Sequence, residues 1–181
     1  MNAPQHARAG FRPGPLSVAV VMTGGTIAKS YSPAKAQLYN FEPKVKDIIA
    51  GLRTDDLSFT YIDLLHLDSL DIQDTERAQI AAAIAGSCKN HDAVLVTHGT
   101  DSMVRTGEYV CDRMSGFSIP VIFTGAMVPF TVSGSDAVQN VTEALLALRL
   151  VPAGVYVVFH NRVLPLPGAQ KDIKTLTFEE I

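Results

Sequence analysis

Four short segments of this 181-residue sequence place hydroxyl, carboxyl and small residues directly after apolar runs. They read TGGT from Thr23, DSLD from Asp68, THGTD from Thr97 and TGAM from Thr124. A threonine hydroxyl can act as a nucleophile when a neighbouring group accepts its proton. Small residues let a ligand approach backbone N–H groups, which can stabilise a developing negative charge. The segments therefore indicate one site for nucleophilic chemistry on a small polar substrate.

The runs before these segments are predicted to be buried strands. They are unbroken apolar stretches bounded by turn residues, which is typical of strands covered on both faces. Five strands are expected: Leu16–Met22, Leu57–Leu67, DAVLVTHG from Asp92, IPVIFTGAM from Ile119 and GVYVVFH from Gly154. Helical stretches separate them, so we expect an α/β fold, a mainly parallel, Rossmann-like sheet with helices on both faces. Ligands of such sheets bind beyond the carboxyl ends of the strands, where the four segments lie.

Particular residues mark the starts and faces of the predicted helices. One helix is expected to begin at Glu42–Pro43, since proline is tolerated in a first turn, and another to be capped by Asp74 or Thr75. A later helix is expected to run from about Asp136 to Leu150. It is expected to bury one stripe of apolar side chains, formed by Val138, Val141, Leu145 and Leu148.

The same four segments admit two other interpretations. Threonine, serine, aspartate and glycine are favoured in ordinary turns and caps, so one segment alone would indicate only local structure. A nucleotide site is disfavoured, because TGGT lacks the GxGxxG pattern and Lys29 stands in the wrong place for a P-loop lysine. The agreement among four segments favours a small-molecule site with its own chemistry.

Overall composition narrows the class of protein further. Hydrophobic residues make up 47%, charged residues 18%, and the net charge is −3, so no basic field favours nucleic acid. No apolar run approaches the roughly 20 residues of a membrane span. Cys88 and Cys111 are expected to be reduced thiols, compatible with the cytoplasm. Residues 1–15 are interpreted as a mobile tail that lacks the apolar core of a signal peptide, and residues 16–181 as a single domain.

Candidate partners for a threonine nucleophile occur after the first segment. Thr26 is followed by a polar stretch that contains Tyr31 and Tyr39. A tyrosine on a mobile loop can close over a ligand and exclude water. We therefore interpret the stretch after Thr26 as a lid.

The third segment offers a second group of the same kind. Thr100 adjoins Asp101, and a neutral lysine beside them could accept the hydroxyl proton. Lys171 and Lys174 are the lysines available for this relay. An amino-acid substrate would also need an anion for its ammonium group and donors for its carboxylate, and Asp101 and Ser69 suit these two roles.

The segments, taken in order, resemble the bacterial-type L-asparaginase family. The resemblance is carried by TGGTIA (Thr23–Ala28), DS (Asp68–Ser69), HGTDSM (His98–Met103) and FTGAM (Phe123–Met127), and SDAVQNVTEAL is similar to the helix that follows. It extends over roughly Leu16–Thr177, nearly the whole chain. It implies hydrolysis of L-asparagine to L-aspartate and ammonia, without a metal or cofactor, by a homo-oligomer.

The resemblance also implies roles for individual residues. The nucleophile falls on Thr26 and the assisting lid tyrosine on Tyr31, with Tyr39 as the alternative. The second catalytic group falls on Thr100, Asp101 and Lys171, and one small gap in the alignment would replace Lys171 by Lys174. The substrate-binding positions are implied to be Gly25, Asp68, Ser69, Thr100 and Asp101.

One departure from the usual family pattern bears on specificity. Long-chain members are nearly twice this length and carry a second domain, which gives an acidic residue to a neighbouring subunit's site. The sequence therefore resembles short-chain members with one catalytic domain, and its preference for asparagine over glutamine stays open. The alternatives to an enzyme are a non-catalytic module that binds an amino acid and, less favoured, a nucleotide-binding α/β domain. Release of ammonia from asparagine separates these hypotheses.

Overall fold

The computed structural model describes residues 12–33, 36–40, 43–114 and 116–181. Its central feature is a six-stranded sheet of order β4-β1-β5-β6-β7-β8. Its neighbouring strands are parallel except for the last pair, β7 and β8, which is antiparallel. The predicted mainly parallel sheet is therefore confirmed. The strands are β1 (Leu16–Gly24), β4 (Leu57–Leu67), β5 (Ala93–Thr97), β6 (Pro120–Thr124), β7 (Gly154–Phe159) and β8 (Arg162–Pro165).

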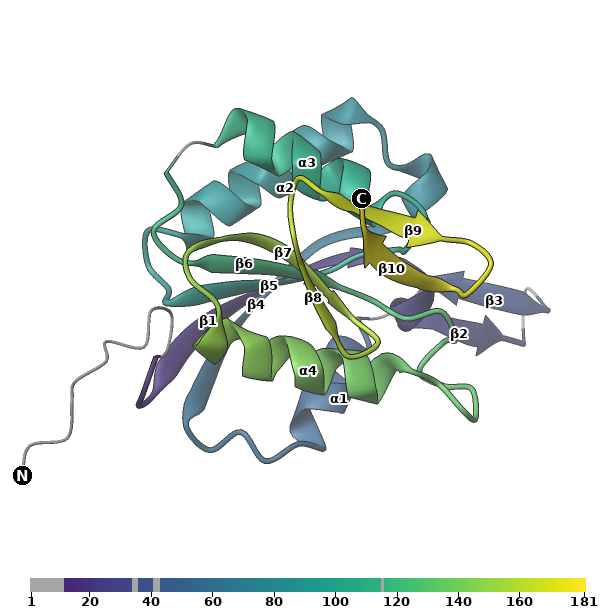
Figure 1. Ribbon diagram of the computed structural model, residues 1–181. Coiled ribbons are helices and arrows are strands. Elements are labelled where there is room, and N and C mark those ends of the chain that lie inside the picture. The colour runs from purple at the N-terminus through teal and green to yellow at the C-terminus, as the bar shows by residue number, and fades with distance from the viewer. Residues whose placement is uncertain (1–11, 34–35, 41–42, 115) are drawn as a thin grey trace, which may run out of the picture.

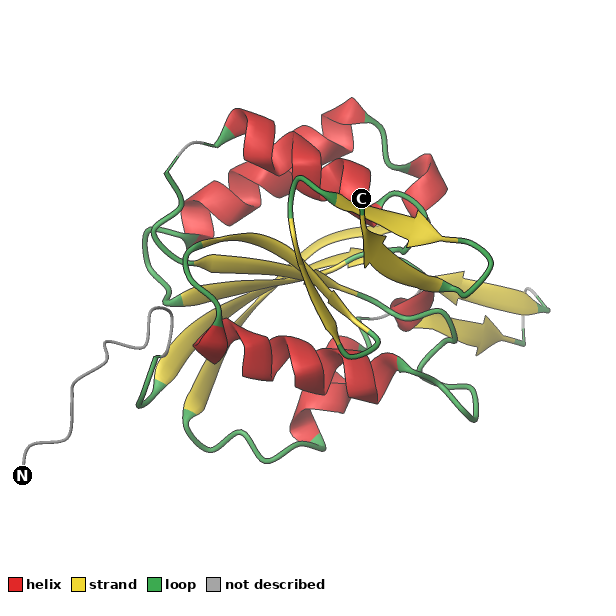
Figure 2. Cartoon of the chain, viewed as in Figure 1, coloured by secondary structure: helices red, strands yellow, loops and turns green. Residues whose placement is uncertain are grey.

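Helices cover both faces of this sheet, as Figures 1 and 2 show. α1 (Val45–Ala50) and α4 (Ala137–Leu150) pack on one face, and α2 (Asp74–Ser87) and α3 (Met103–Arg113) pack on the other. Successive residues of a strand point to opposite faces, so the apolar run of β1 serves both layers. Two apolar clusters result, one on each side of the sheet.

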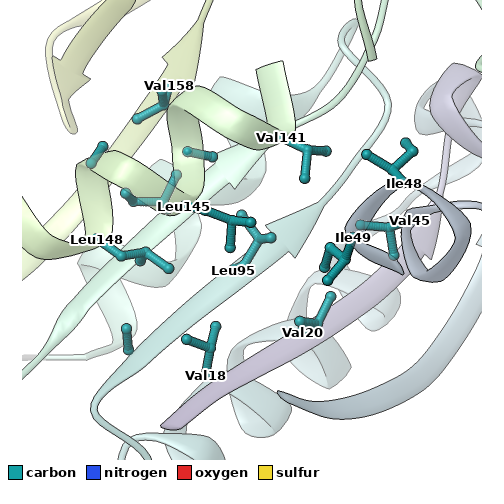
Figure 3. Close-up of a cluster of buried hydrophobic side chains, with 14 of the residues drawn as sticks. Val18, Val20, Val45, Ile48, Ile49, Leu95, Val141, Leu145, Leu148 and Val158 are labelled. Atoms are coloured by element: carbon teal, nitrogen blue, oxygen red, sulfur yellow. The ribbon is translucent and has the colours of Figure 1, made fainter. Parts of the chain in front are cut away.

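The cluster between the sheet and the α1–α4 layer is shown in Figure 3. Val18, Val20 and Leu95 from the sheet meet side chains of both helices there, and all three are fully buried. Each such side chain contributes about 2 kcal/mol through burial. Three of the four apolar side chains predicted to face inward from α4 are buried, but Val138 is 42% exposed because it lies at the edge of the buried stripe.

Two predicted helix starts need correction. Gln73 is the N-cap of α2, and its backbone N–H donates to a carboxylate oxygen of Glu76 at 2.9 Å. Asp74 is instead the first helical residue, where its carboxylate accepts from Arg77. The helix expected from Glu42–Pro43 begins at Val45, and Glu42 lies outside the described residues.

Two hairpins lie beside the main sheet and were absent from the sequence-based prediction. The stretch after Thr26 forms a 3-10 turn, η1 (Thr26–Ala28), and then the antiparallel strands β2 (Lys29–Ser32) and β3 (Gln37–Asn40). The second hairpin pairs β9 (Ala169–Asp172) with β10 (Thr177–Glu180). Figure 1 shows both hairpins near the same end of the sheet.

The predicted tail is described only from residue 12 onward, since residues 1–11 lie outside the described part. Arg12 and Arg149 bond to each other through their backbones, and the Arg149 guanidinium donates to the carbonyl of Gly14 at 2.7 Å. This part of the expected tail is thus held against the end of α4. Within the described residues, no helix combines the length and apolar character needed to cross a membrane.

Candidate active site

The exits of the central strands lie side by side, as the sequence predicted. In the register of the sheet, Met22 pairs with Thr97, and Thr97 pairs in turn with Thr124. The chain therefore leaves β1, β5 and β6 at one edge. This edge collects the glycine- and threonine-containing segments that follow the three strands.

Two glycines let these exits approach each other closely. Gly25 has a φ of 77°, and a Cβ there would lie 2.4 Å from the Cα of Gly99. A Cβ on Gly99 would in turn lie 2.6 Å from Oγ of Ser69. Side chains at either position would push the segments apart, so glycine is required for contact. The predicted site residue Gly25 thus acts as a spacer between Thr26 and the β5 exit.

The β5 exit carries a hydrogen-bonded group of three side chains. Lys171 Nζ donates to Thr100 Oγ1 at 2.9 Å and to Asp101 Oδ1 at 2.6 Å. Thr100 is buried, whereas the Asp101 side chain is 47% exposed and can meet a ligand. A lysine amine at hydrogen-bonding distance from a hydroxyl is placed to exchange a proton with it.

The tertiary structure also separates the two candidate lysines. Lys171 lies on β9 opposite Phe178, a fully buried side chain that anchors the hairpin. Lys174 lies in the exposed turn after β9, where its backbone N–H donates to Asp172. The structure thus brings Lys171 to Thr100, and it leaves Lys174 exposed in the turn.

Ser69 occupies the floor of the site. It opens a 3-10 turn, η2 (Ser69–Asp71), and is 1% exposed. Its Oγ accepts from the backbone N–H of Asp101 at 3.3 Å, and its carbonyl accepts from the hydroxyl of Ser102. These contacts join the β4 exit to the β5 exit.

Asp68 lies at the same rim, but its carboxylate already has partners within the protein. Oδ1 accepts from the backbone N–H of Ser69 at 3.1 Å, and Oδ2 forms an ion pair with Lys29 of β2. Asp68 therefore connects the floor of the site to the base of the β2–β3 hairpin.

Thr26 lies in η1 and is half-buried. In the described part of the chain, no group forms a hydrogen bond with its hydroxyl. The hydroxyl of Tyr31, whose residue is 61% exposed, likewise has no such bond to a described residue. Of the predicted catalytic residues, the structure thus assembles Thr100, Asp101 and Lys171, whereas Thr26 and Tyr31 are not joined to them by hydrogen bonds.

The two lid tyrosines lie on opposite faces of the β2–β3 hairpin. Tyr31 pairs with Leu38, and Tyr39 pairs with Ser30, and directly paired residues share a face. Lys29 is two residues before Tyr31 and lies on the same face as it. Lys29 reaches Asp68, so the face of Tyr31 contacts the rim, and Tyr39 also lines a pocket together with Lys29 and Asp68.

His98 supports the β5 exit from beneath. The ring is completely buried, and Nδ1 lies 2.8 Å from the carbonyl oxygen of Gly99. Burial lowers the pKa of His98 to about 4, an effect to which the positive charge of Arg77 adds. The imidazole is therefore neutral near pH 7, with its proton on Nδ1 so that it can donate to Gly99.

Residues 17–177 match the family model described as "Asparaginase, N-terminal". The chain belongs to the asparaginase family. It is 33% identical over 153 residues to the L-asparaginase of Thermococcus kodakarensis, which covers 82% of this chain and 45% of that relative. It is 29% identical over 162 residues to L-asparaginase 2 of Escherichia coli K12, covering 82% and 44% of the two chains.

Solved L-asparaginases share the fold. The thermostable enzyme from Thermococcus kodakarensis superimposes with a TM-score of 0.82 at 28% identity, over 91% of this chain and 51% of that one. L-asparaginase I from Vibrio cholerae gives 0.78 at 25% identity, over 92% and 51%. The expected likeness to the N-terminal domain of L-asparaginases is confirmed. The chain spans about half the length of the curated relatives it matches.

A polar cluster absent from the sequence-based prediction supports the β6 exit of this asparaginase-family fold. Asp136 accepts from the backbone N–H groups of Met127 and Val128, and His160 contacts the same carboxylate. The aspartate and asparagine of SDAVQN, one helical turn apart, were a signal that two polar side chains share a face of α4. The partner from the β7–β8 turn gave no such signal.

Proposed function

We propose that the chain hydrolyses the side-chain amide of L-asparagine to give L-aspartate and ammonia. The observation that carries this proposal is the hydrogen-bonded group of Lys171, Thr100 and Asp101. It lies beside the exit that bears Thr26, because Gly25 and Gly99 are in close contact. Two hydroxyls, one amine and one exposed carboxylate at a single rim suit acyl transfer from a small zwitterion. Membership of the asparaginase family supports the same reaction.

In the first step of the proposed mechanism, the hydroxyl oxygen of Thr26 attacks the amide carbon of asparagine. Tyr31 assists by relaying this proton, so that its phenol oxygen accepts the proton of Thr26 while its own proton moves to the leaving nitrogen. The carbon–nitrogen bond breaks, ammonia leaves, and the aspartyl group stays on Thr26 as an ester. Backbone N–H groups at the Gly99–Thr100 turn are suited to stabilise the developing oxyanion.

In the second step, water attacks the ester and releases L-aspartate. Thr100 orients the water and passes its proton toward Lys171, while Asp101 holds the lysine in place. The proton held by Lys171 then passes through Thr100 to the ester oxygen of Thr26 as that bond breaks, so the enzyme returns to its starting state. Short hydrogen bonds already link the three supporting side chains, which limits the reorganisation needed for this step.

The substrate's charged groups are assigned to the same rim. The exposed oxygen of Asp101 receives the ammonium group, while Ser69 and the backbone near Gly25 receive the carboxylate. Asp68 belongs to this set as well, and it contacts substrate only when its ion pair with Lys29 opens.

Ammonia release by Thr26→Ala tests the assignment of the nucleophile. The variant is expected to lose turnover while keeping the wild-type circular dichroism spectrum and melting temperature. Thr60→Ala, on an exposed position of β4, is the matched control and should retain full activity. Near-normal turnover by Thr26→Ala would contradict the assignment. If the wild type binds asparagine but releases no ammonia, the non-catalytic binding module replaces the enzyme.

We also propose that residues 16–181 act as one catalytic unit in the cytoplasm and that the chain forms a homo-oligomer. Cys88 and Cys111 are free, and burial raises the pKa of Cys111 to about 11, so its thiol stays protonated. Free thiols are typical of reducing compartments. Light scattering coupled to size-exclusion chromatography tests self-association, and a mass equal to one chain would contradict it.

A further inference from the structure

The carboxylate of Asp136 joins three segments of the chain at the N-terminal end of α4. It accepts from the backbone N–H groups of Met127 and Val128 at 3.0 and 2.9 Å. It also accepts from Asn140 Nδ2 and lies 2.9 Å from His160 Nε2. The side chain is only 13% exposed. These contacts bind the loop after β6 and the turn between β7 and β8 to one helix end (Figure 1).

Asn140, one turn later on α4, connects the same two segments and is completely buried. Its Nδ2 donates to the carbonyl of Gly125 at 3.0 Å, and its Oδ1 accepts from the backbone N–H of His160 at 3.1 Å. The network therefore holds both ends of the loop from Gly125 to Val128 (the β6 exit loop). Of the groups that contact the Asp136 carboxylate, those of Met127 and Val128 belong to the loop, and that of Asn140 belongs to α4. The ring of His160 is the one that comes from another segment, the turn between β7 and β8.

The β6 exit loop lies directly against the backbone of the β5 exit. The N–H of His98 donates to the carbonyl of Thr124 at 2.9 Å. A Cβ on Gly125 would come within 2.3 Å of the carbonyl oxygen of His98. Because no space separates the two segments, the loop supports the backbone that leads into the adjoining Gly99–Thr100 turn.

The ionised state of Asp136 suits it to this position. Burial by itself would raise the pKa of Asp136, but the hydrogen bonds from Met127, Val128 and His160 outweigh it and lower the pKa. An ionised carboxylate offers only acceptors, so it can satisfy all of these donors at once. His160 has a φ of 45° and its ring packs on Phe159 at 4.4 Å, which fixes the direction of Nε2.

We propose that Asp136 and His160 are positioning residues of the candidate active site, which hold the β6 exit loop against the Gly99–Thr100 turn through the hydrogen bond between their side chains. This role rests on the proposed hydrolysis of asparagine. Neither residue contacts substrate. They act through the loop, whose displacement would misalign the group formed by Thr100 and Lys171.

His160→Asn isolates the side-chain bond, because asparagine tolerates the positive φ of this turn but is too short to reproduce the ring contact. The expected result is a loss of about 10-fold in kcat/KM for asparagine. Most of the loss should fall on kcat, since the loop adjoins the Gly99–Thr100 turn, whose backbone N–H groups and Thr100 hydroxyl are assigned to the chemical steps. Asn161→Gly is the matched control, since Asn161 shares the turn and its positive φ but does not contact Asp136.

Hydrogen exchange gives a readout that does not depend on turnover. Asp136→Ala removes both oxygens that accept from the loop, so the backbone amides of Met127 and Val128 should exchange faster, by about 10-fold or more. His160→Asn should accelerate the same two amides to a smaller extent, and Asn161→Gly should leave them unchanged. Equal kinetics and equal exchange in the His160→Asn and Asn161→Gly variants would overturn the proposal.

The two proposals fail in different ways. If the wild type releases no ammonia from asparagine, the proposed function fails, and exchange at Met127 and Val128 alone decides whether Asp136 and His160 hold the loop. If the wild type is active but His160→Asn loses only melting temperature, with kcat and KM unchanged below the transition, the residues stabilise the fold without positioning the site, and the inference fails.

Discussion

The two halves of the candidate site differ in how completely the fold assembles them. At the β5 exit, Lys171, Thr100 and Asp101 are joined by hydrogen bonds, and the chain beneath them is buried. At the β1 exit, the hydroxyl of Thr26 forms no hydrogen bond to the described residues, and Tyr31 projects from an exposed two-stranded hairpin.

This difference indicates a division of labour between a rigid half and a closing half. Groups that stabilise charge must be positioned before reaction, and the central sheet provides that rigidity. A lid must open to admit substrate, so it cannot be anchored as firmly. The ion pair between Lys29 and Asp68 is one of the contacts between the hairpin and the rim.

Among the residues that support the Thr26 nucleophile, the largest effect is expected in the rigid half. Lys171→Met removes the amine that contacts Thr100 and Asp101, so kcat/KM for asparagine should fall by about 10³- to 10⁴-fold. Lys174→Met should change it by less than about 2-fold, because Lys174 is exposed in the turn after β9. Ammonia release by the two purified variants checks this, and equal losses would erase the distinction between the lysines.

Acid should destabilise the rigid half through His98. Its folded pKa, about 4, lies below the ordinary value of 6.5, so the unfolded chain binds the proton more readily. The free energy of unfolding is therefore unaffected by this group above pH 6.5. It decreases by about 3 kcal/mol in total as the pH falls toward 4. Asp92 and Asp136 also have lowered pKa values, and their contributions are lost only below their ordinary value of 3.8.

Urea denaturation between pH 7 and pH 4 measures this loss. His98→Gln keeps a donor for the Gly99 carbonyl but cannot gain a proton, so its unfolding free energy should depend less on pH over the same interval. Parallel pH profiles for the wild type and the variant would show that His98 is not the titrating group.

A smaller effect is expected in the closing half. Tyr31→Phe removes the hydroxyl assigned to assist Thr26, and kcat should fall by about 10- to 100-fold with little change in melting temperature. Tyr39→Phe is the matched variant, because it alters the opposite face of the same hairpin. Steady-state kinetics of both proteins decide which face closes over the substrate. A greater loss in Tyr39→Phe would transfer the role to Tyr39.

The smallest effect concerns the contact between the two halves. Lys29→Met breaks the ion pair with Asp68, whose members are partly exposed, so its contribution is at most about 1 kcal/mol. KM for asparagine should rise by about 2- to 5-fold as the hairpin loses one of its anchors, while kcat changes little. Lys89→Met, at an exposed position just after the C-terminal end of α2, should leave KM unchanged. A fall in kcat equal to that of Tyr31→Phe would show that the hairpin is part of the rigid half.

The main sheet could be predicted because each of its central strands is a continuous apolar run that only a doubly covered sheet can bury. The strand exits followed from the same reasoning, since parallel strands end at one edge. The two hairpins could not be predicted in this way. Their strands are short and polar, as in Lys29–Ser32, so hydrophobic periodicity gives no signal there.

The sequence by itself determined which strands end at the rim and the residue types gathered there, because these depend on local apolar runs and on the motifs that follow them. It also placed Thr26, Thr100 and Asp101 at those exits. Only the tertiary structure decided that Lys171 rather than Lys174 meets Thr100, that Asp68 pairs with Lys29, and that His160 meets Asp136. Each of these contacts joins segments far apart in the chain, and the packing of hairpins and turns on the sheet sets which of them meet.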